Sequence, residues 1–114
     1  MYTRRLARLP TFTLDDGAVV HQATTAAARL LGLAFLPSLA EGHALLIPRC
    51  RSVHTFGMRF PIDVAFLDGC GRPLRVERGV RARRILACRG AFAVLETRAG
   101  EVERFLARPL RSVG

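Results

Sequence analysis

The chain contains no lysine, no asparagine and no tryptophan, although 18 of its 114 residues are basic. All of these basic residues are therefore arginine, and alanine is abundant. This composition is typical of GC-rich coding, which weakens the usual link between a formal charge of +9 and a nucleic-acid partner. We interpret the charge as a solvated, Arg-rich surface and do not expect a nucleic-acid partner.

Cysteine is scarce as well, with only Cys50, Cys70 and Cys88 in the chain. These residues form no CxxC pair and no zinc-ligand spacing. An odd number of cysteines argues against a disulfide framework and is typical of a reducing cytoplasm. Cys50 and Cys88 could still pair if the fold places them close together.

Long apolar runs are also missing. The longest uncharged stretches cover residues 17–28 and 30–40, and neither reaches the roughly 18 residues that a membrane span needs. The apolar stretch that follows Arg4 and Arg5 is too short for the core of a signal peptide. We therefore expect a cytoplasmic protein with no membrane span.

Half of the residues are hydrophobic, which indicates a folded chain, and the length suits one domain over residues 1–114 with a core at about 18–106. Apolar or alternating runs predict strands at 18–21, 43–47, 64–67, 74–77 and 91–96. Helical spacing predicts short helices at 26–31, between a Thr cap and Gly32, and at 102–106. These elements predict a mainly β fold, a small single-domain β-sandwich or barrel with one or two short helices.

Residues 49–63 form a long connection between two predicted strands, and they contain a dense group of polar and sulfur-bearing side chains. One interpretation is a copper site. Cys50, His54 and Met58 follow one another with three residues between each pair, as in the ligand loop of blue-copper proteins, and His43 could supply a second imidazole. That loop should lie near the C-terminus of an exported protein, whereas this one lies in mid-chain with no export signal.

Two further interpretations of the same segment are open. In an acid/base pair, His54 titrates near neutrality and Asp63 orients it, with Thr55 or Cys50 as nucleophile. No nucleophile-elbow pattern accompanies these residues. In a purely structural interpretation, Met58 faces the core and Asp63 accepts hydrogen bonds from turn amides.

A run of basic residues lies further along the chain, at Arg78, Arg81, Arg83, Arg84 and Arg89. No aromatic residue interleaves with them, so the run does not predict a stacking platform for single-stranded nucleic acid. Electrostatic binding of nucleic acid through these arginines is a minor alternative, and it would weaken steeply with salt.

Three segments, taken in order, resemble one known family. Residues 53–68 read VHTFGMRFPIDVAFLD, with an aromatic residue and a Met, a Pro-hydrophobic-Asp step, an apolar strand and an Asp-Gly-type turn. Residues 32–35 read GLAF, and residues 93–96 read AVLE before an Ala-Gly pair. Together they resemble the signature of the bacterial and archaeal family called domain of unknown function 192 (DUF192). The chain departs from that signature where Phe56-Gly57 replaces a Trp, and it lacks the closing Gly-Asp turn near residues 108–110.

The resemblance implies a compact β-sandwich or barrel of jelly-roll-like character with minor helices, in a family that has no established biochemical function. It also places His54, Thr55, Met58 and Asp63 among the signature positions together with Glu96. If the fold joins the two segments, these residues would line one cleft.

We therefore predict a noncatalytic small-ligand-binding or accessory protein whose ligand-binding residues are His54, Thr55, Met58, Asp63 and Glu96. The alternative is a small enzyme that uses His54 and Asp63 as an acid/base pair. We expect neither a metal nor another cofactor, and the expected partner is a small ligand or a protein.

Overall fold

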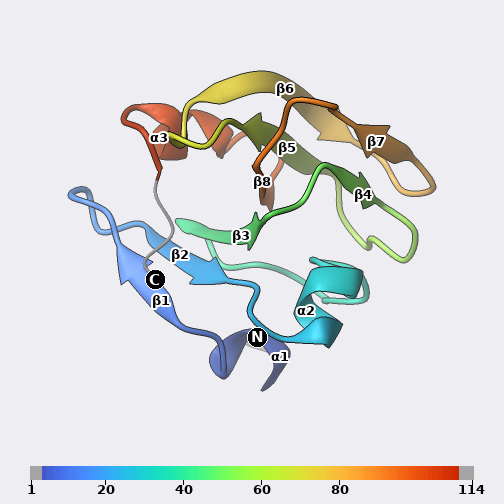
Figure 1. Ribbon diagram of the computed structural model, residues 1–114. Helices are drawn as coiled ribbons and strands as arrows, with labels where there is room; N and C mark the ends of the chain where they lie inside the picture. Colours follow the sequence, from blue (N-terminus) through green and yellow to red (C-terminus); the bar gives the residue numbers. More distant parts are fainter. Residues whose placement is uncertain (1–3, 111–114) are drawn as a thin grey trace.

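The computed structural model describes residues 4–110, which form mostly β-strands and three short helices (Figure 1). In chain order the elements are α1 (Arg4–Ala7), β1 (Thr11–Thr13), β2 (Val19–Gln22), α2 (Ala26–Leu31), β3 (His43–Pro48), β4 (Ser52–His54), β5 (Ile62–Leu67), β6 (Pro73–Val80), β7 (Ile85–Ala87), β8 (Ala93–Arg98) and α3 (Val102–Leu106). The predicted mainly β class is confirmed. The sequence missed α1 and the three-residue strands β1, β4 and β7.

The strands form two sheets. Six strands make one sheet in the order β1-β2-β3-β8-β5-β6, and β4 pairs with β7 in a second. All neighbours run antiparallel except β2 and β3, which are parallel and are joined by the crossover that contains α2. Because β1 and β6 remain at the edges of the larger sheet, the fold is not a closed barrel.

Local sequence signals explain the best-predicted helix. Thr25 has extended backbone dihedrals and its side chain accepts a hydrogen bond from the Ala28 N–H at 3.0 Å, so it is the N-cap of α2. Gly32 ends the helix at φ +56°, a conformation that favours glycine. The predicted start and stop of this helix are both confirmed.

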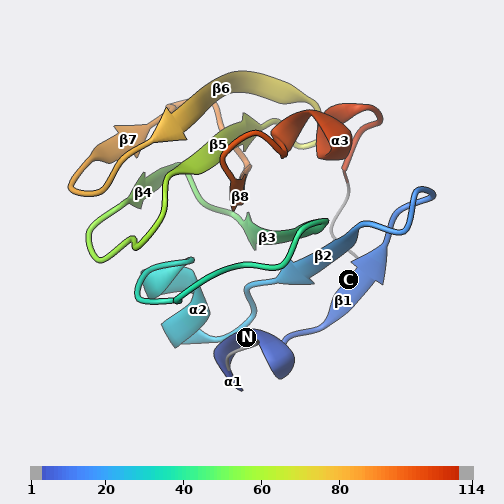
Figure 2. The same cartoon turned by 180° about the vertical axis from the view of Figure 1, so that it is seen from behind.

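Side chains alternate between the two faces of the six-stranded sheet, so each face carries its own core. On one face, Leu45, Val64 and Val94 pack with side chains from α1, α2 and the β4–β7 sheet. On the other, Leu46 and Leu95 pack with side chains from α3. Figures 1 and 2 show this arrangement from opposite sides, with α2 and α3 lying far apart. The face to which a side chain points therefore decides which helix it meets.

The structure also bears on two simpler expectations. Cys50, Cys70 and Cys88 are all free thiols, so the Cys50–Cys88 pair considered above is not formed. Over residues 4–110, no helix combines the length and the apolar character that crossing a membrane would require.

Candidate functional site

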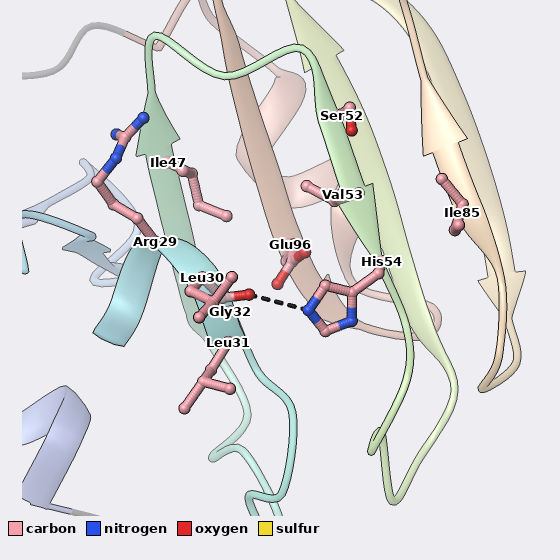
Figure 3. Close-up of a pocket in the computed structure, with 10 residues that line it drawn as sticks. All are labelled: Arg29, Leu30, Leu31, Gly32, Ile47, Ser52, Val53, His54, Ile85 and Glu96. Atoms are coloured by element: carbon pink, nitrogen blue, oxygen red, sulfur yellow. Dashed lines mark hydrogen bonds between the residues drawn. The ribbon is translucent and has the colours of Figure 1, made fainter. Parts of the chain in front are cut away.

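A pocket of about 320 Å³ lies between the end of α2 and the small β4–β7 sheet (Figure 3). Its walls are mainly aliphatic and come from four elements: Leu30 and Leu31 of α2, Ile47 of β3, Val53 of β4 and Ile85 of β7. Aliphatic walls with a few polar groups are typical of small-molecule sites, and this volume is near the lower end of their usual range of roughly 300–1,000 Å³. The polar groups therefore decide what the pocket can do.

His54, at the end of β4, is held by the main chain on both sides of its ring. Its Nδ1 accepts a hydrogen bond from the Phe56 N–H at 3.1 Å, and its Nε2 lies 2.9 Å from the Leu30 carbonyl oxygen (Figure 3). Because a carbonyl only accepts, these contacts assign the neutral tautomer with the proton on Nε2. His54 thus ties the end of α2 to β4, and neither ring nitrogen is left free.

Glu96 of β8 and Arg29 of α2 are the other titratable groups in this pocket, and the Glu96 side chain points toward the space between Gly32 and His54 (Figure 3). The Arg29 guanidinium donates to the carbonyl oxygens of Pro48 at 2.5 Å and of Arg49 at 3.1 Å. Glu96 is only 1% exposed. Its Oε1 accepts one hydrogen bond, from the Leu33 N–H at 3.2 Å, whereas Oε2 accepts none from any described residue. Burial raises the pKa of this carboxyl to about 7, against the opposing effects of the Leu33 N–H and of the Arg5 charge.

The loop that follows α2 passes between Glu96 and Arg5 of α1. The Arg5 Nη2 group donates hydrogen bonds to the carbonyl oxygens of Gly32 at 2.9 Å and of Ala34 at 2.6 Å. Its Nε is buried without a hydrogen-bond partner among the described residues, and burial lowers the pKa of the guanidinium. Gly32 is required here because a Cβ at this position would lie 2.6 Å from Oε1 of Glu96. No pattern in the sequence indicated this arrangement, because Arg5 lies far from the other residues along the chain.

Asp63 does not reach the pocket, because it points to the opposite face of the sheet. Its Oδ1 accepts the Gly79 N–H at 2.9 Å, and its Oδ2 accepts the N–H groups of Gly100 at 2.9 Å and Val102 at 3.3 Å. These three bonds fix the end of β6 and the start of α3, in the structural role that one interpretation of Asp63 predicted. The structure therefore does not bring His54 and Asp63 together as an acid/base pair.

Thr55 and Met58 lie outside the pocket as well. The buried Thr55 hydroxyl donates to the Arg81 carbonyl at 2.7 Å and accepts the Arg84 N–H at 2.8 Å, so it joins the β4–β5 and β6–β7 connections. Met58 is buried in the core on the α2 side of the sheet. Of the five predicted ligand-binding residues, the structure brings only His54 and Glu96 to one pocket, and their binding role stays a prediction.

The groups considered for copper are not gathered either. The Cys50 thiol donates to the Ser52 carbonyl oxygen at 3.2 Å, and Nδ1 of His43 lies 2.9 Å from Nε2 of His21. Both nitrogens of His54 contact the main chain, as described above. Within residues 4–110, no three His, Cys, Asp or Glu side chains are placed to hold one metal ion.

Two crystal structures have a similar fold. A protein of unknown function from Novosphingobium aromaticivorans has a TM-score of 0.67 and 23% identity, covering 87% of this chain and 78% of that one. A Sinorhizobium meliloti protein, provisionally described as a transcription regulator, has the same score and identity and covers 87% and 85%. At this identity the likeness concerns the fold alone.

The comparison of sequences is more specific about the family. No curated protein matches the chain. Residues 13–110 match the model of DUF192, a family described as an uncharacterized ACR. This match covers most of the chain and all three segments that carry the resemblance noted from the sequence. The chain therefore belongs to the DUF192 family.

Proposed function

We propose that this protein binds a small molecule, without transforming it, in the pocket between α2 and the β4–β7 sheet. The observation that carries the proposal is Glu96, a buried carboxyl group with one oxygen that accepts no hydrogen bond from the described residues, in a pocket whose walls are mainly aliphatic. This oxygen opens to the pocket, so a ligand can supply a hydrogen bond that the protein itself does not.

The pocket favours a ligand with a largely apolar body and one polar group. The aliphatic side chains would cover the body, and Glu96 would meet the polar group. With a pKa of about 7, this carboxyl is present in both forms near neutral pH. Its protonated form donates a hydrogen bond to a carbonyl or ether oxygen, whereas its ionised form accepts one from an N–H or O–H group. A ligand with a carboxylate or phosphate at this position would be disfavoured, because it would face the ionised form.

The state of His54 supports binding rather than catalysis. A general base needs a free lone pair within reach of the substrate, and the Nδ1 lone pair of His54 is already taken by the Phe56 N–H. Its Nε2–H is directed at the Leu30 carbonyl. The imidazole thus links two walls of the pocket, and Glu96 is the group with an oxygen that can form a hydrogen bond to a ligand.

The proposal is tested by screening neutral and weakly basic fragments by thermal shift and confirming hits by calorimetry. Ile85 is 70% exposed at the pocket mouth, and Leu74 is 49% exposed on β6, outside the pocket. We expect hits that stabilise the wild type and the matched control Leu74→Arg equally. Those hits should lose at least tenfold in affinity with Ile85→Arg, which blocks the mouth.

Glu96→Gln tests the carboxyl separately from the cavity. The amide keeps the shape but cannot ionise, so hits that donate a hydrogen bond to Glu96 should weaken, while purely apolar hits should not. A screen without hits, or hits that Ile85→Arg leaves unchanged, would overturn the proposal. A chemically altered ligand recovered from the wild type, but not from Glu96→Gln, would favour the enzymatic alternative.

A further inference from the structure

Three loops meet at one side of the molecule, away from the pocket floor. They are the segment after α2, the β4–β5 connection and the β6–β7 connection, and both views place them opposite the β1–β2 turn (Figures 1 and 2). We call this surface the loop end and define it by Phe35, Phe56, Arg59, Arg81, Arg83 and Arg84, all of which are exposed.

Hydrogen bonds fix the three loops to one another. The Thr55 N–H donates to the Arg84 carbonyl at 2.8 Å, and the Arg83 N–H donates to the Thr55 carbonyl at 3.3 Å. The Phe35 N–H donates to the Gly57 carbonyl at 2.8 Å, which attaches the segment after α2. The loop end is therefore a preformed surface, and its side chains keep their spacing before any partner arrives.

The loop end carries two aromatic rings that the fold does not bury. Phe35 is 57% exposed and Phe56 is 48% exposed. Phe35 has φ +66°, an uncommon conformation for a residue with a side chain. Its ring lies across Gly57, where a Cβ would come within 2.5, 2.7 and 3.0 Å of three ring atoms. A strained backbone and a glycine thus hold this ring over the surface, and such strain is concentrated at functional sites.

The charges around the rings are uncompensated. The guanidinium groups of Arg59, Arg81, Arg83 and Arg84 make no ion pair and no hydrogen bond with any described residue. The neighbouring Arg78, in contrast, pairs with Glu103 of α3. Four free guanidinium groups around two exposed rings attract a partner that is both anionic and aromatic.

We infer that the loop end binds single-stranded nucleic acid, with bases stacked on Phe35 and Phe56 and phosphates bound by the surrounding arginines. Such stacking is tolerant of sequence, so a general single-strand site is expected. A bilayer is favoured less, because insertion needs apolar side chains that project, whereas the Phe35 ring lies over Gly57. The sequence did not predict a stacking platform, because the Arg run contains no aromatic residue, whereas the fold supplies both rings from distant segments.

The test measures fluorescence anisotropy with labelled 12-nucleotide oligouridine and oligodeoxythymidine over a salt series. We expect binding at low salt, with affinity falling as salt rises. Arg59→Gln and Arg84→Gln should each lower the slope of log affinity against log salt by about 0.7. The matched control Arg72→Gln, on the β5–β6 turn, should leave the slope unchanged.

The rings are tested with Phe35→Leu and Phe56→Leu, which keep apolar bulk and remove the stacking face. Each should weaken oligonucleotide binding about tenfold with an unchanged salt slope, while the exposed Phe92→Leu on the far side has no effect. Oligouridine and oligodeoxythymidine separate RNA from DNA as the source of the strand.

Anionic vesicles containing phosphatidylserine provide the competing arm. Vesicle binding that depends on both rings, without oligonucleotide binding, would overturn the inference and assign the loop end to a membrane surface. Oligonucleotide binding that ignores both ring substitutions would also overturn it, because only nonspecific charge would remain. Either result can be distinguished from a failure of the ligand pocket, which is tested by Ile85→Arg and Glu96→Gln and not by the ring and arginine substitutions.

Discussion

Glu96 and Asp63 are two buried carboxylic acids on neighbouring strands, and they differ in the number of hydrogen bonds that they accept. β8 and β5 pair directly, with Asp63 opposite Thr97 and Glu96 opposite Val64. Asp63 accepts three main-chain hydrogen bonds, one from β6 and two from the start of α3, whereas Glu96 accepts one. Both oxygens of Asp63 are therefore used in structural hydrogen bonds, whereas one oxygen of Glu96 can still accept a hydrogen bond from another partner. Burial alone does not separate these roles, but the number of donors facing each carboxyl group does.

The largest effect should come from changing the Asp63 carboxylate to the corresponding amide. Asp63→Asn replaces one acceptor oxygen by an NH₂ group that confronts main-chain donors. We expect it to lower the free energy of unfolding by about 4 kcal/mol. Urea denaturation with several probes measures this loss. A loss below about 1 kcal/mol would mean that water or a shifted turn replaces the carboxylate, and the contrast with Glu96 would fail.

The pH dependence of stability isolates Glu96. Its pKa is raised in the folded state from 4.5 to about 7, so the folded protein keeps a proton that the unfolded chain has lost. Stability therefore falls as pH rises from about 4.5 to about 7, by roughly 3 kcal/mol in all. Arg29 and His54 are the other titratable side chains that line this pocket, and the Arg5 charge acts on Glu96 from the other side of the loop after α2.

His21 has the opposite effect on the pH dependence of stability, so its contribution has to be removed from the measurement. Burial lowers its pKa from 6.5 to about 4, so its contribution to stability is lost as pH falls through this interval. The difference in unfolding free energy between the wild type and Glu96→Gln removes the His21 contribution, since both proteins retain it. That difference should decline from pH 4.5 to 7, and a flat difference would show that Glu96 has an ordinary pKa.

Gly32→Ala examines the close approach of the main chain to Glu96. The added Cβ meets Oε1, and φ +56° is strained for alanine, so we expect a loss of about 2 kcal/mol. Gly17→Ala is the matched control, because Gly17 has φ +89° with open space around the position of a Cβ. The loss of stability in Gly17→Ala therefore measures the backbone strain of a positive φ alone. Equal losses in thermal unfolding would mean that the Glu96 side chain moves aside without cost.

The smallest effect is expected for Glu96→Gln at pH 5, where the wild-type carboxyl is protonated. The change should stay below about 1 kcal/mol, because a neutral amide replaces a neutral acid of the same shape. Calorimetric unfolding at this pH checks it against Asp63→Asn under the same conditions. A loss comparable to that of Asp63→Asn would identify an unseen structural partner for Glu96.

The sequence predicted elements whose signals are local. Thr25 and Gly32 mark the two ends of α2, and the Asp-Gly turn after β5 marks a hairpin. The strand β7 was missed because three residues inside an Arg-rich run are too few for an alternation pattern to be recognised. Pairing with β4, which the sequence does not encode locally, makes it a strand.

The candidate site was predicted in part for a related reason. All six residues of β5 are buried, so no alternation reveals which face Asp63 takes. The prediction of one cleft placed Asp63 beside His54, although they lie on different faces. Glu96 entered through the family resemblance. Arg5 was missed because contacts between α1 and the loop after α2 depend on the packed structure.

The place of β8 in the sheet has a consequence for synthesis of the chain. This strand lies between β3 and β5 in the sheet, yet it is the last strand to be made. Until it emerges from the ribosome, β1–β3 and β5–β6 are separate ribbons, each with an unsatisfied apolar edge that can pair with other chains. A nascent chain that stops before residue 93 is therefore exposed to aggregation. The segment that delivers the Glu96 carboxyl is also the one that joins the two ribbons into a single sheet.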